Sequence, residues 1–143
     1  MSRGRANVLI VDDDVELAKA LAAMLASEGG YESRLVHRAS DAVAAAAAFP
    51  PDIVFLDIEL PDMSGYEVAQ ILRRHARLQA TRFIALTDHI EHPRREDARA
   101  AGFERYLVKP VTEIELRKVL RRRVSFGYGS AYMYAPAQTI MSP

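Results

Sequence analysis

Short apolar runs alternate along this chain with longer segments in which apolar residues recur at helical spacing. This alternation constrains the fold more than any other feature. The runs are four or five residues long and mostly rich in Val, Ile, Leu or Phe, at residues 7–11, 32–36, 52–56, 82–86 and 105–108. Between them, apolar residues fall three and four positions apart, as on one face of a helix. Strands that alternate with helices predict a parallel sheet covered on both faces.

Residues typical of helix ends mark where several of these helices begin or stop. Gly29 and Gly30 are expected to end the first helix, because glycine tolerates the left-handed backbone found there. Ser64 with Glu67, and Thr112 with Glu115, have the spacing of capping boxes. In such a box, side chains satisfy the free amides at the start of a helix, so both positions predict a helix beginning.

These elements predict an α/β fold, a doubly wound five-stranded parallel sheet with helices on both faces. Right-handed crossovers, which parallel connections almost always adopt, produce this arrangement. For five strands the flavodoxin-like order 2-1-3-4-5 is the most economical choice. The fourth helix, at about residues 93–101, is short and weakly amphipathic, so we expect this region to be mobile.

Composition narrows the classes of function. The chain has 143 residues, enough for one domain of ordinary size. Its 19 basic and 19 acidic residues balance, which argues against a protein that coats nucleic acid or anionic membrane. The absence of cysteine excludes disulfides and thiolate chemistry. No apolar run approaches the roughly 18–20 residues of a membrane span, and we expect a cytoplasmic protein with no membrane partner.

The last 19 residues, 125–143, differ from the rest because they carry no charge and hold four aromatic side chains. We therefore predict a domain over residues 1–124 and a tail over residues 125–143. The tail is either flexible or packs on the face formed by the fourth helix, the fifth strand and the fifth helix. A homodimer through that face or through the tail is a further alternative.

Polar side chains follow the predicted strands at the point where each strand ends. They are Asp12, Asp13 and Asp14 after the first run, Asp57 after the third, Thr87 and Asp88 after the fourth, and Lys109 after the fifth. In a parallel sheet these ends lie along one edge, and a ligand crevice opens where the strand order reverses, here between strands one and three. Asp12, Asp13 and Asp57 are therefore expected to lie together, with Thr87 and Lys109 facing them.

This set of side chains points to phosphoryl transfer onto an aspartate. Three carboxylates repel one another unless a cation joins them, and a loosely caged set of oxygen ligands suits Mg²⁺. Lysine is a compact positive charge that pairs with phosphate. A threonine hydroxyl can donate a hydrogen bond to a phosphoryl oxygen. Together these groups describe a site in which an aspartate is the nucleophile.

Four stretches at these strand ends resemble the receiver domain of bacterial two-component response regulators. They are residues 8–13, 55–65, 85–87 and 106–110, and the resemblance runs from about residue 7 to residue 123. Four ordered motifs make the match specific. The resemblance implies a response regulator in phosphorelay signalling, which accepts a phosphoryl group from a histidine kinase or a histidine phosphotransfer protein.

The resemblance also implies roles for individual residues. Asp57 would accept the phosphoryl group. Asp12, Asp13, Asp57 and the backbone carbonyl of Glu59 would hold Mg²⁺. Lys109 would neutralise charge on the incoming phosphoryl group.

Three further features of the family would pass the signal on. Thr87 would hydrogen-bond the bound phosphoryl group, and the peptide bond between Lys109 and Pro110 would be cis. Tyr106 would be the aromatic switch whose ring moves with Thr87, or else a plain half-buried aromatic residue. Phosphorylation would then shift a two-state element built from the fourth helix, the fifth strand and the fifth helix. The chain would not be an enzyme, beyond assisting its own phosphorylation and dephosphorylation.

Two residues modify the family pattern. Asp88 stands where most receivers have a small residue, and its carboxylate would repel a phosphoryl dianion. Glu59, two residues past Asp57, can overhang the site. We expect slow reaction with small phosphodonors and a changed rate of hydrolysis. The alternative is a receiver-like binding module that acts without phosphorylation, because Asp88 restricts the site.

The length left after the domain favours a stand-alone regulator. The 19 residues that follow cannot hold an output domain of about 50 or more residues. We therefore expect output through contact with an unidentified protein, and no DNA binding. A Mg²⁺-dependent phosphatase of the haloacid dehalogenase type is less favoured, because that type has its nucleophile after the first strand and carries a large cap.

Overall fold

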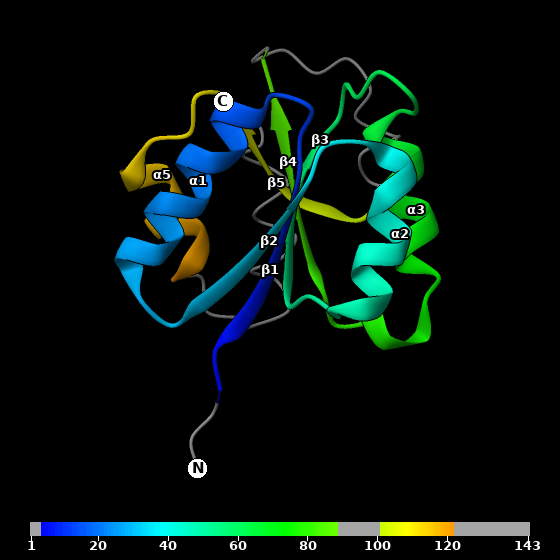
Figure 1. Ribbon diagram of the computed structural model, residues 1–143, viewed down its shortest axis with the longest axis horizontal. Coiled ribbons are helices and arrows are strands. Elements are labelled where there is room, and N and C mark those ends of the chain that lie inside the picture. Colours follow the sequence, from blue (N-terminus) through cyan, green and yellow to red (C-terminus); the bar gives the residue numbers. More distant parts are fainter. Residues whose placement is uncertain (1–3, 89–100, 122–143) are drawn as a thin grey trace.

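A computed structural model describes residues 4–88 and 101–121 of the chain (Figure 1). Five parallel strands form one sheet in the order β2-β1-β3-β4-β5, which confirms the predicted fold class and strand order. The strands are β1 (Ala6–Val11), β2 (Tyr31–Val36), β3 (Ile53–Asp57), β4 (Arg82–Thr87) and β5 (Phe103–Val108).

Helices cover both faces of this sheet. They are α1 (Val15–Glu28), α2 (Ala39–Ala48), α3 (Gly65–Arg73) and α5 (Glu113–Leu120), with a short 3₁₀ helix at Ala76–Leu78. Figure 1 shows α1 and α5 on one face and α2 and α3 on the other. The tail predicted at residues 125–143 lies outside the described residues, as does the helix predicted at residues 93–101 apart from its last residue.

The helix ends follow from local chemistry, and α3 and α5 begin directly after Ser64 and Thr112, where the sequence predicted. The carboxylate of Asp14 accepts the Leu17 amide at the start of α1, at 3.1 Å. Ser64 accepts the Tyr66 amide at 3.1 Å, and Thr112 accepts the Glu115 amide at 3.2 Å. At its other end, α1 stops where Gly29 and Gly30 both take positive φ, 80° and 87°.

The apolar runs are continuous because both faces of the sheet are buried. Successive side chains of a strand point to opposite faces, so each strand supplies two cores. Val8 and Ile10 pack under α1 and α5, whereas Leu9 and Val11 pack under α2 and α3. The central strand β3 is buried along its whole length. The sheet therefore presents its strand ends on a rigid frame.

The structure adds one residue or two to several strands. β5 begins at Phe103, two residues earlier than expected, because Phe103 is fully buried beside Phe83 of β4. The pairing of β4 with β5 shifts register between Phe83 and Ile84.

Within residues 4–88 and 101–121, no helix is long and apolar enough to cross a membrane.

Candidate functional site

Parallel pairing brings the ends of four strands to one edge of the sheet. Val11 pairs with Leu56, so Asp12 and Asp57 leave β1 and β3 side by side. Thr87 ends β4 opposite Val108, and Lys109 follows directly. Asp12, Asp57 and Thr87 are all buried, with 1–3% of their surface exposed. The structure thus brings together the predicted polar residues at the carboxyl edge, at the point where the strand order reverses.

Asp12, Asp13 and Asp57 form the acidic cluster of this edge. One carboxylate oxygen from each lies within 4.8 Å of the others. Asp12 and Asp57 are buried while Asp13 is exposed, so the cluster faces solvent on one side. An all-oxygen set with an open side suits Mg²⁺, which keeps several of its waters and takes one or two carboxylates. The residues present therefore fit the predicted metal.

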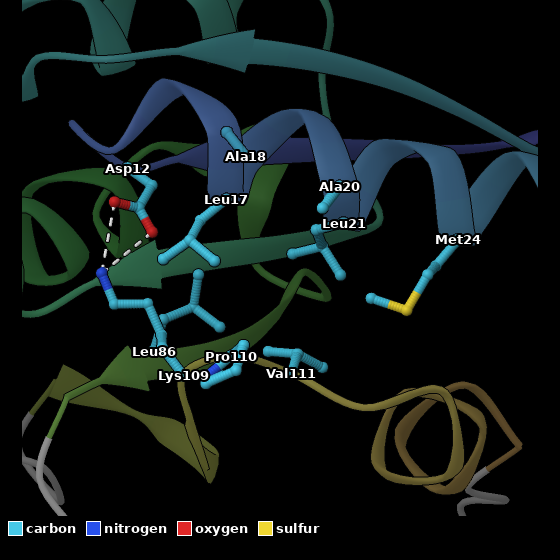
Figure 2. A pocket seen from close by; sticks show the side chains of 10 residues that line it. All are labelled: Asp12, Leu17, Ala18, Ala20, Leu21, Met24, Leu86, Lys109, Pro110 and Val111. Carbon is cyan, nitrogen blue, oxygen red and sulfur yellow. Dashed lines mark hydrogen bonds and ion pairs between the residues drawn. The ribbon is translucent and has the colours of Figure 1, made fainter.

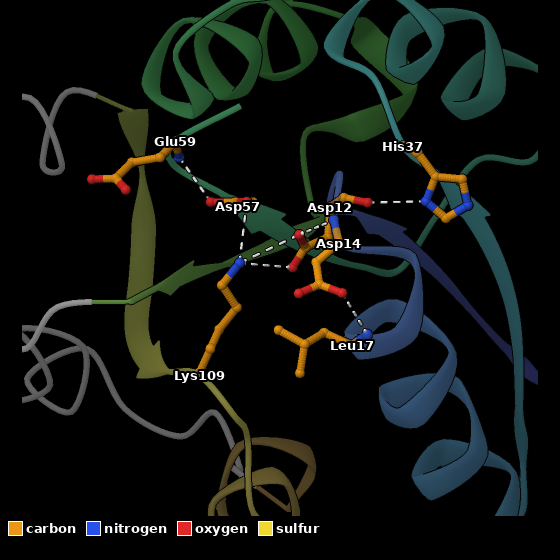
Figure 3. A network of polar contacts seen from close by, with 7 residues as sticks. All are labelled: Asp12, Asp14, Leu17, His37, Asp57, Glu59 and Lys109. Atoms are coloured by element: carbon orange, nitrogen blue, oxygen red, sulfur yellow. Dashed lines mark hydrogen bonds and ion pairs between the residues drawn. The ribbon is translucent and has the colours of Figure 1, made fainter. Parts of the chain in front are cut away.

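The ammonium group of Lys109 lies between the two buried carboxylates (Figure 3). Its Nζ is 3.2 Å from Oδ2 of Asp12 and 3.2 Å from Oδ2 of Asp57. The lysine side chain is itself 7% exposed. Buried charges are stable only when they are paired. Lys109 compensates one of the two negative charges of Asp12 and Asp57. A second cation, such as a metal ion, would compensate the other.

Burial and charge shape the proton affinities of this group. Burial is the largest influence on Asp57 and raises its pKa to about 7. The amide of Glu59, which donates to Oδ1 of Asp57 at 2.8 Å, acts in the opposite direction. The charge of Asp12 raises the pKa further and that of Lys109 lowers it. Burial also acts to lower the pKa of Lys109, but Asp57 and Asp12 outweigh it and raise that pKa, so the ammonium stays charged.

The loop between β3 and α3 folds back on Asp57. Glu59 and Ser64 form an antiparallel bridge, and the Gly65 amide donates to the Ile58 carbonyl at 3.1 Å. A Cβ at Gly65 would press on the backbone of Asp57 and Ile58, well inside van der Waals contact. Glycine is required here because the two ends of the loop touch.

The loop after β1 is held from the neighbouring strand. The Asp12 amide donates to the Val36 carbonyl at 3.1 Å, and Nδ1 of His37 lies 2.9 Å from the Asp12 carbonyl oxygen (Figure 3). Since a carbonyl can only accept, Nδ1 carries the hydrogen. The contact of His37 could not be predicted from the sequence, because 25 residues separate it from Asp12 and no local pattern marks it.

The other predicted residues lie around the cluster. Thr87 is buried, and its carbonyl accepts the Lys109 amide at 2.7 Å. Glu59 and Asp88 are exposed. Tyr106 is half-buried, with its ring 5.9 Å from that of Phe103 and its hydroxyl 3.4 Å from that of Tyr66. The Lys109–Pro110 bond is cis, as predicted.

A small pocket adjoins the site on the α1 side (Figure 2). Its volume is about 40 Å³, and Asp12 and Lys109 stand at one end while Leu17, Met24 and Val111 line the rest. Small-molecule sites usually enclose about 300–1,000 Å³. The pocket is much smaller than such a site, whereas the acidic cluster is open to solvent on the side of Asp13.

The fold and the site define a doubly wound α/β domain with a carboxylate–lysine centre at the switch point of its sheet. The sequence matches the response regulator receiver domain over residues 8–121. The chain belongs to this family.

Known proteins of the family resemble it in sequence and in structure. The DNA-binding response regulator MtrA of Mycolicibacterium smegmatis is 32% identical over 124 residues, 87% of this chain and 53% of that protein. The chemotaxis response regulator CheY4 of Vibrio cholerae has a TM-score of 0.76 at 28% identity, covering 82% of this chain and 98% of that one. The receiver domain of the sensor histidine kinase PA1611 from Pseudomonas aeruginosa was solved with a magnesium ion in its active site cleft. It has a TM-score of 0.74 at 31% identity, over 83% of this chain and 97% of that one.

The chain spans about half the length of MtrA, the DNA-binding relative. DNA binding is stated in the name of MtrA and belongs here to that longer protein. For this chain, the absence of DNA binding, the stand-alone character and the domain boundary at residue 124 stay predictions.

Proposed function

We propose that this receiver domain accepts a phosphoryl group on Asp57, with Mg²⁺, from a histidine kinase or a histidine phosphotransfer protein. One observation carries the proposal. A buried lysine ammonium lies 3.2 Å from both Asp12 and Asp57, and the carboxylate of Asp13 completes the cluster on its exposed side. Such a centre supplies a nucleophile, a cation for the phosphoryl group and ligands for a metal.

The side chains divide the reaction between them. A carboxylate oxygen of Asp57 forms a bond to phosphorus while the bond from phosphorus to the donor nitrogen breaks, and that electron pair leaves on the donor. The Glu59 amide, 2.8 Å from Oδ1 of Asp57, orients the carboxylate and stabilises its charged form. Mg²⁺ held by Asp12, Asp13 and Asp57, with the Glu59 carbonyl as a further ligand, would neutralise charge on the phosphoryl oxygens.

Lys109 and Thr87 respond to the new group. Once Asp57 carries the phosphoryl group as an acyl phosphate, Lys109 loses one carboxylate partner and gains phosphoryl oxygens. The Thr87 hydroxyl donates to the same group from the end of β4. Tyr106, on the neighbouring strand, then senses the displacement. β5 and α5 form part of the surface that a target protein reads, and the fourth helix predicted from the sequence, which lies outside the described residues, is expected to belong to it. The chain performs no other catalysis.

Nuclear magnetic resonance with Mg²⁺ and beryllofluoride, a phosphoryl mimic, tests this proposal. We expect amide shifts at Asp57, Thr87 and Lys109 that spread to Tyr106 and α5. Asp57→Asn is the control, because it removes the acceptor oxygen and should show no beryllofluoride response. If the folded wild type does not respond either, the protein is not a phosphoacceptor, and the binding module that acts without phosphorylation replaces it.

Access to the site is tested through Asp88. The exposed carboxylate follows Thr87 directly, so it adds negative charge where an anionic phosphodonor approaches. We expect Asp88→Ala to react several-fold faster with phosphoramidate, measured by mass spectrometry of the phosphorylated protein. Asp88→Asn should react at an intermediate rate. Equal rates for all three proteins would show that Asp88 does not control access.

A further inference from the structure

The carboxylate of Asp62 caps a helix to which it does not belong. Its Oδ1 accepts the Ala39 amide and its Oδ2 accepts the Ser40 amide, both at 3.1 Å. These are the first two amides of α2, and 23 and 22 residues separate them from Asp62. The residue at the N-cap position, Arg38, has an extended backbone but no capping hydrogen bond from its side chain. Asp62 therefore caps α2 although it is remote in the sequence, whereas the usual cap is a Ser or Asp at the N-cap position itself.

Asp62 belongs to the loop that carries the phosphoacceptor side of the site. That loop starts at Asp57, includes Glu59 and closes at Gly65, where its two ends touch. Figure 1 shows the link from β3 to α3 and the start of α2 at the same edge of the sheet. The two hydrogen bonds of Asp62 thus fix the far part of the loop to α2, while the Gly65 amide fixes its base.

The segment that receives Asp62 also contacts the other acidic loop. Val36 accepts the Asp12 amide at 3.1 Å, and His37 bonds the Asp12 carbonyl at 2.9 Å. Residues 36–40 therefore touch the loop of Asp12 on one side and the loop of Asp57 on the other. A shift of either loop against this segment changes how the carboxylates face each other.

We propose that Asp62 is a positioning residue of the phosphoryl site. By anchoring the loop to α2, it holds the Asp57 carboxylate and the Glu59 backbone in the arrangement that binds Mg²⁺. The effect on Mg²⁺ binding rests on the proposed function. The effect on the order of the loop does not, because it can be measured in the metal-free protein. Outer partners that orient metal ligands typically change affinity by 10–100-fold, and Asp62 acts through the backbone of its loop. Its removal should weaken Mg²⁺ binding by about threefold to tenfold.

A purely structural role makes a different prediction. An anion at a helix N-terminus stabilises the helix wherever the anion comes from. If Asp62 merely stabilises α2, a cap supplied by α2 itself will repair every effect of removing it. Arg38→Ser supplies such a cap, because position 38 already has N-cap geometry. The loop, however, stays detached in the double variant.

The experiment compares wild type, Asp62→Ala, Arg38→Ser and the double variant. Asp41→Ala is the matched control, since it removes an exposed carboxylate from the first turn of α2 without touching the loop. Three quantities are measured. They are the midpoint of urea unfolding, the dissociation constant for Mg²⁺ alone from amide shifts in nuclear magnetic resonance, and the rate of hydrogen exchange of the Glu59 and Gly65 amides without metal. Exchange at buried Phe55 serves as the reference for global opening.

We expect Asp62→Ala to lower the urea midpoint, weaken Mg²⁺ binding and speed exchange at Glu59 and Gly65 at least fivefold more than at Phe55. The double variant should regain the midpoint but keep both other defects. Full recovery in the double variant, or wild-type exchange and affinity in Asp62→Ala, overturns the proposal. If wild type itself binds no Mg²⁺, the proposed function fails, and hydrogen exchange alone decides the role of Asp62.

Discussion

At the scale of single residues, the buried carboxylate of Asp57 couples stability to pH. Its pKa is about 7 in the folded protein and near the usual 3.8 in the unfolded chain. Between these values the folded state binds more protons, so stability falls as pH rises. The functional carboxylate therefore destabilises the metal-free protein at neutral and higher pH.

Replacing this carboxylate removes the penalty. We expect Asp57→Asn, without metal, to be more stable than wild type at pH 8 by up to about 4 kcal/mol, which corresponds to the difference between the two pKa values. The advantage should shrink as pH falls from 7 toward 4, because wild-type Asp57 then becomes protonated. Urea unfolding in the presence of a chelator, at pH 8 and at pH 5, measures the gain in stability and its decrease at lower pH. Exposed Asp13→Asn is the control, and a pH-independent gain for Asp57→Asn would contradict the assignment.

Lys109 stabilises the folded protein, in contrast to Asp57, because it is a buried cation between two buried anions. Removing one partner of a buried pair leaves an uncompensated charge, which costs roughly 3–5 kcal/mol. We expect Lys109→Met to lose about 3 kcal/mol at pH 8 and less at pH 5, measured by urea unfolding. Lys19→Met, on the exposed face of α1, should change stability by less than about 0.5 kcal/mol. A small loss at both pH values for Lys109→Met would mean that water solvates the two carboxylates.

At the scale of elements, Arg82 joins two strands to a helix. Its guanidinium meets the Glu104 carboxylate of β5 at 2.7 Å and donates to the Val119 carbonyl near the end of α5 at 2.8 Å. Both side chains of the ion pair are 21% exposed, so water screens the pair only in part. This contact holds α5 against β5, the outermost strand of the sheet, which ends directly before Lys109.

We expect Arg82→Met to destabilise the protein by about 2 kcal/mol, since hydrogen bonds to charged groups contribute roughly 1.5–3 kcal/mol. Exchange of amides in α5 should rise more than exchange in α2. Arg117, which bonds Glu28 at 3.0 Å but is 42% exposed, provides the comparison. Arg117→Met should lose less than about 1 kcal/mol. Similar losses for the two variants would show that the pair at Arg82 is as well screened as a surface pair.

At the scale of the whole molecule, metal binding and folding are linked. The three carboxylates come together only when β1 and β3 pair, so the proposed Mg²⁺ would bind the folded state and not the unfolded chain. At a hundredfold excess over the dissociation constant, this adds about 2.7 kcal/mol to the stability.

We therefore expect Mg²⁺ to raise the urea midpoint and a chelator to reverse the rise. Because the metal competes with the proton on Asp57, the gain should be smaller at pH 5 than at pH 8. Sodium chloride at matched ionic strength is the control for screening. A rise that sodium chloride reproduces would contradict a specific metal site.

The sequence by itself determined the architecture of this protein and the edge that carries the site. Continuous apolar runs such as residues 53–56 can only be buried on both faces, and helical spacing between them leaves a covered parallel sheet. Polar residues at the strand ends then share one edge, whatever the loops do. Asp14, Ser64 and Thr112 cap their own helices, so their effect was also readable locally.

The tertiary structure alone decided how these residues meet. Lys109 reaches Asp12 across 97 residues of chain, and Asp62 caps a helix that begins 23 residues earlier. The strand ends predicted that Lys109 faces Asp12, but not the distance between them. No local pattern marks the contact of Asp62, because it depends on the path of its loop and on which loops the sheet brings together. The proton affinity of Asp57 follows for the same reason, since burial sets it and burial exists only in the folded chain. Periodicity in a sequence encodes which face is buried, whereas distances between loops arise from packing.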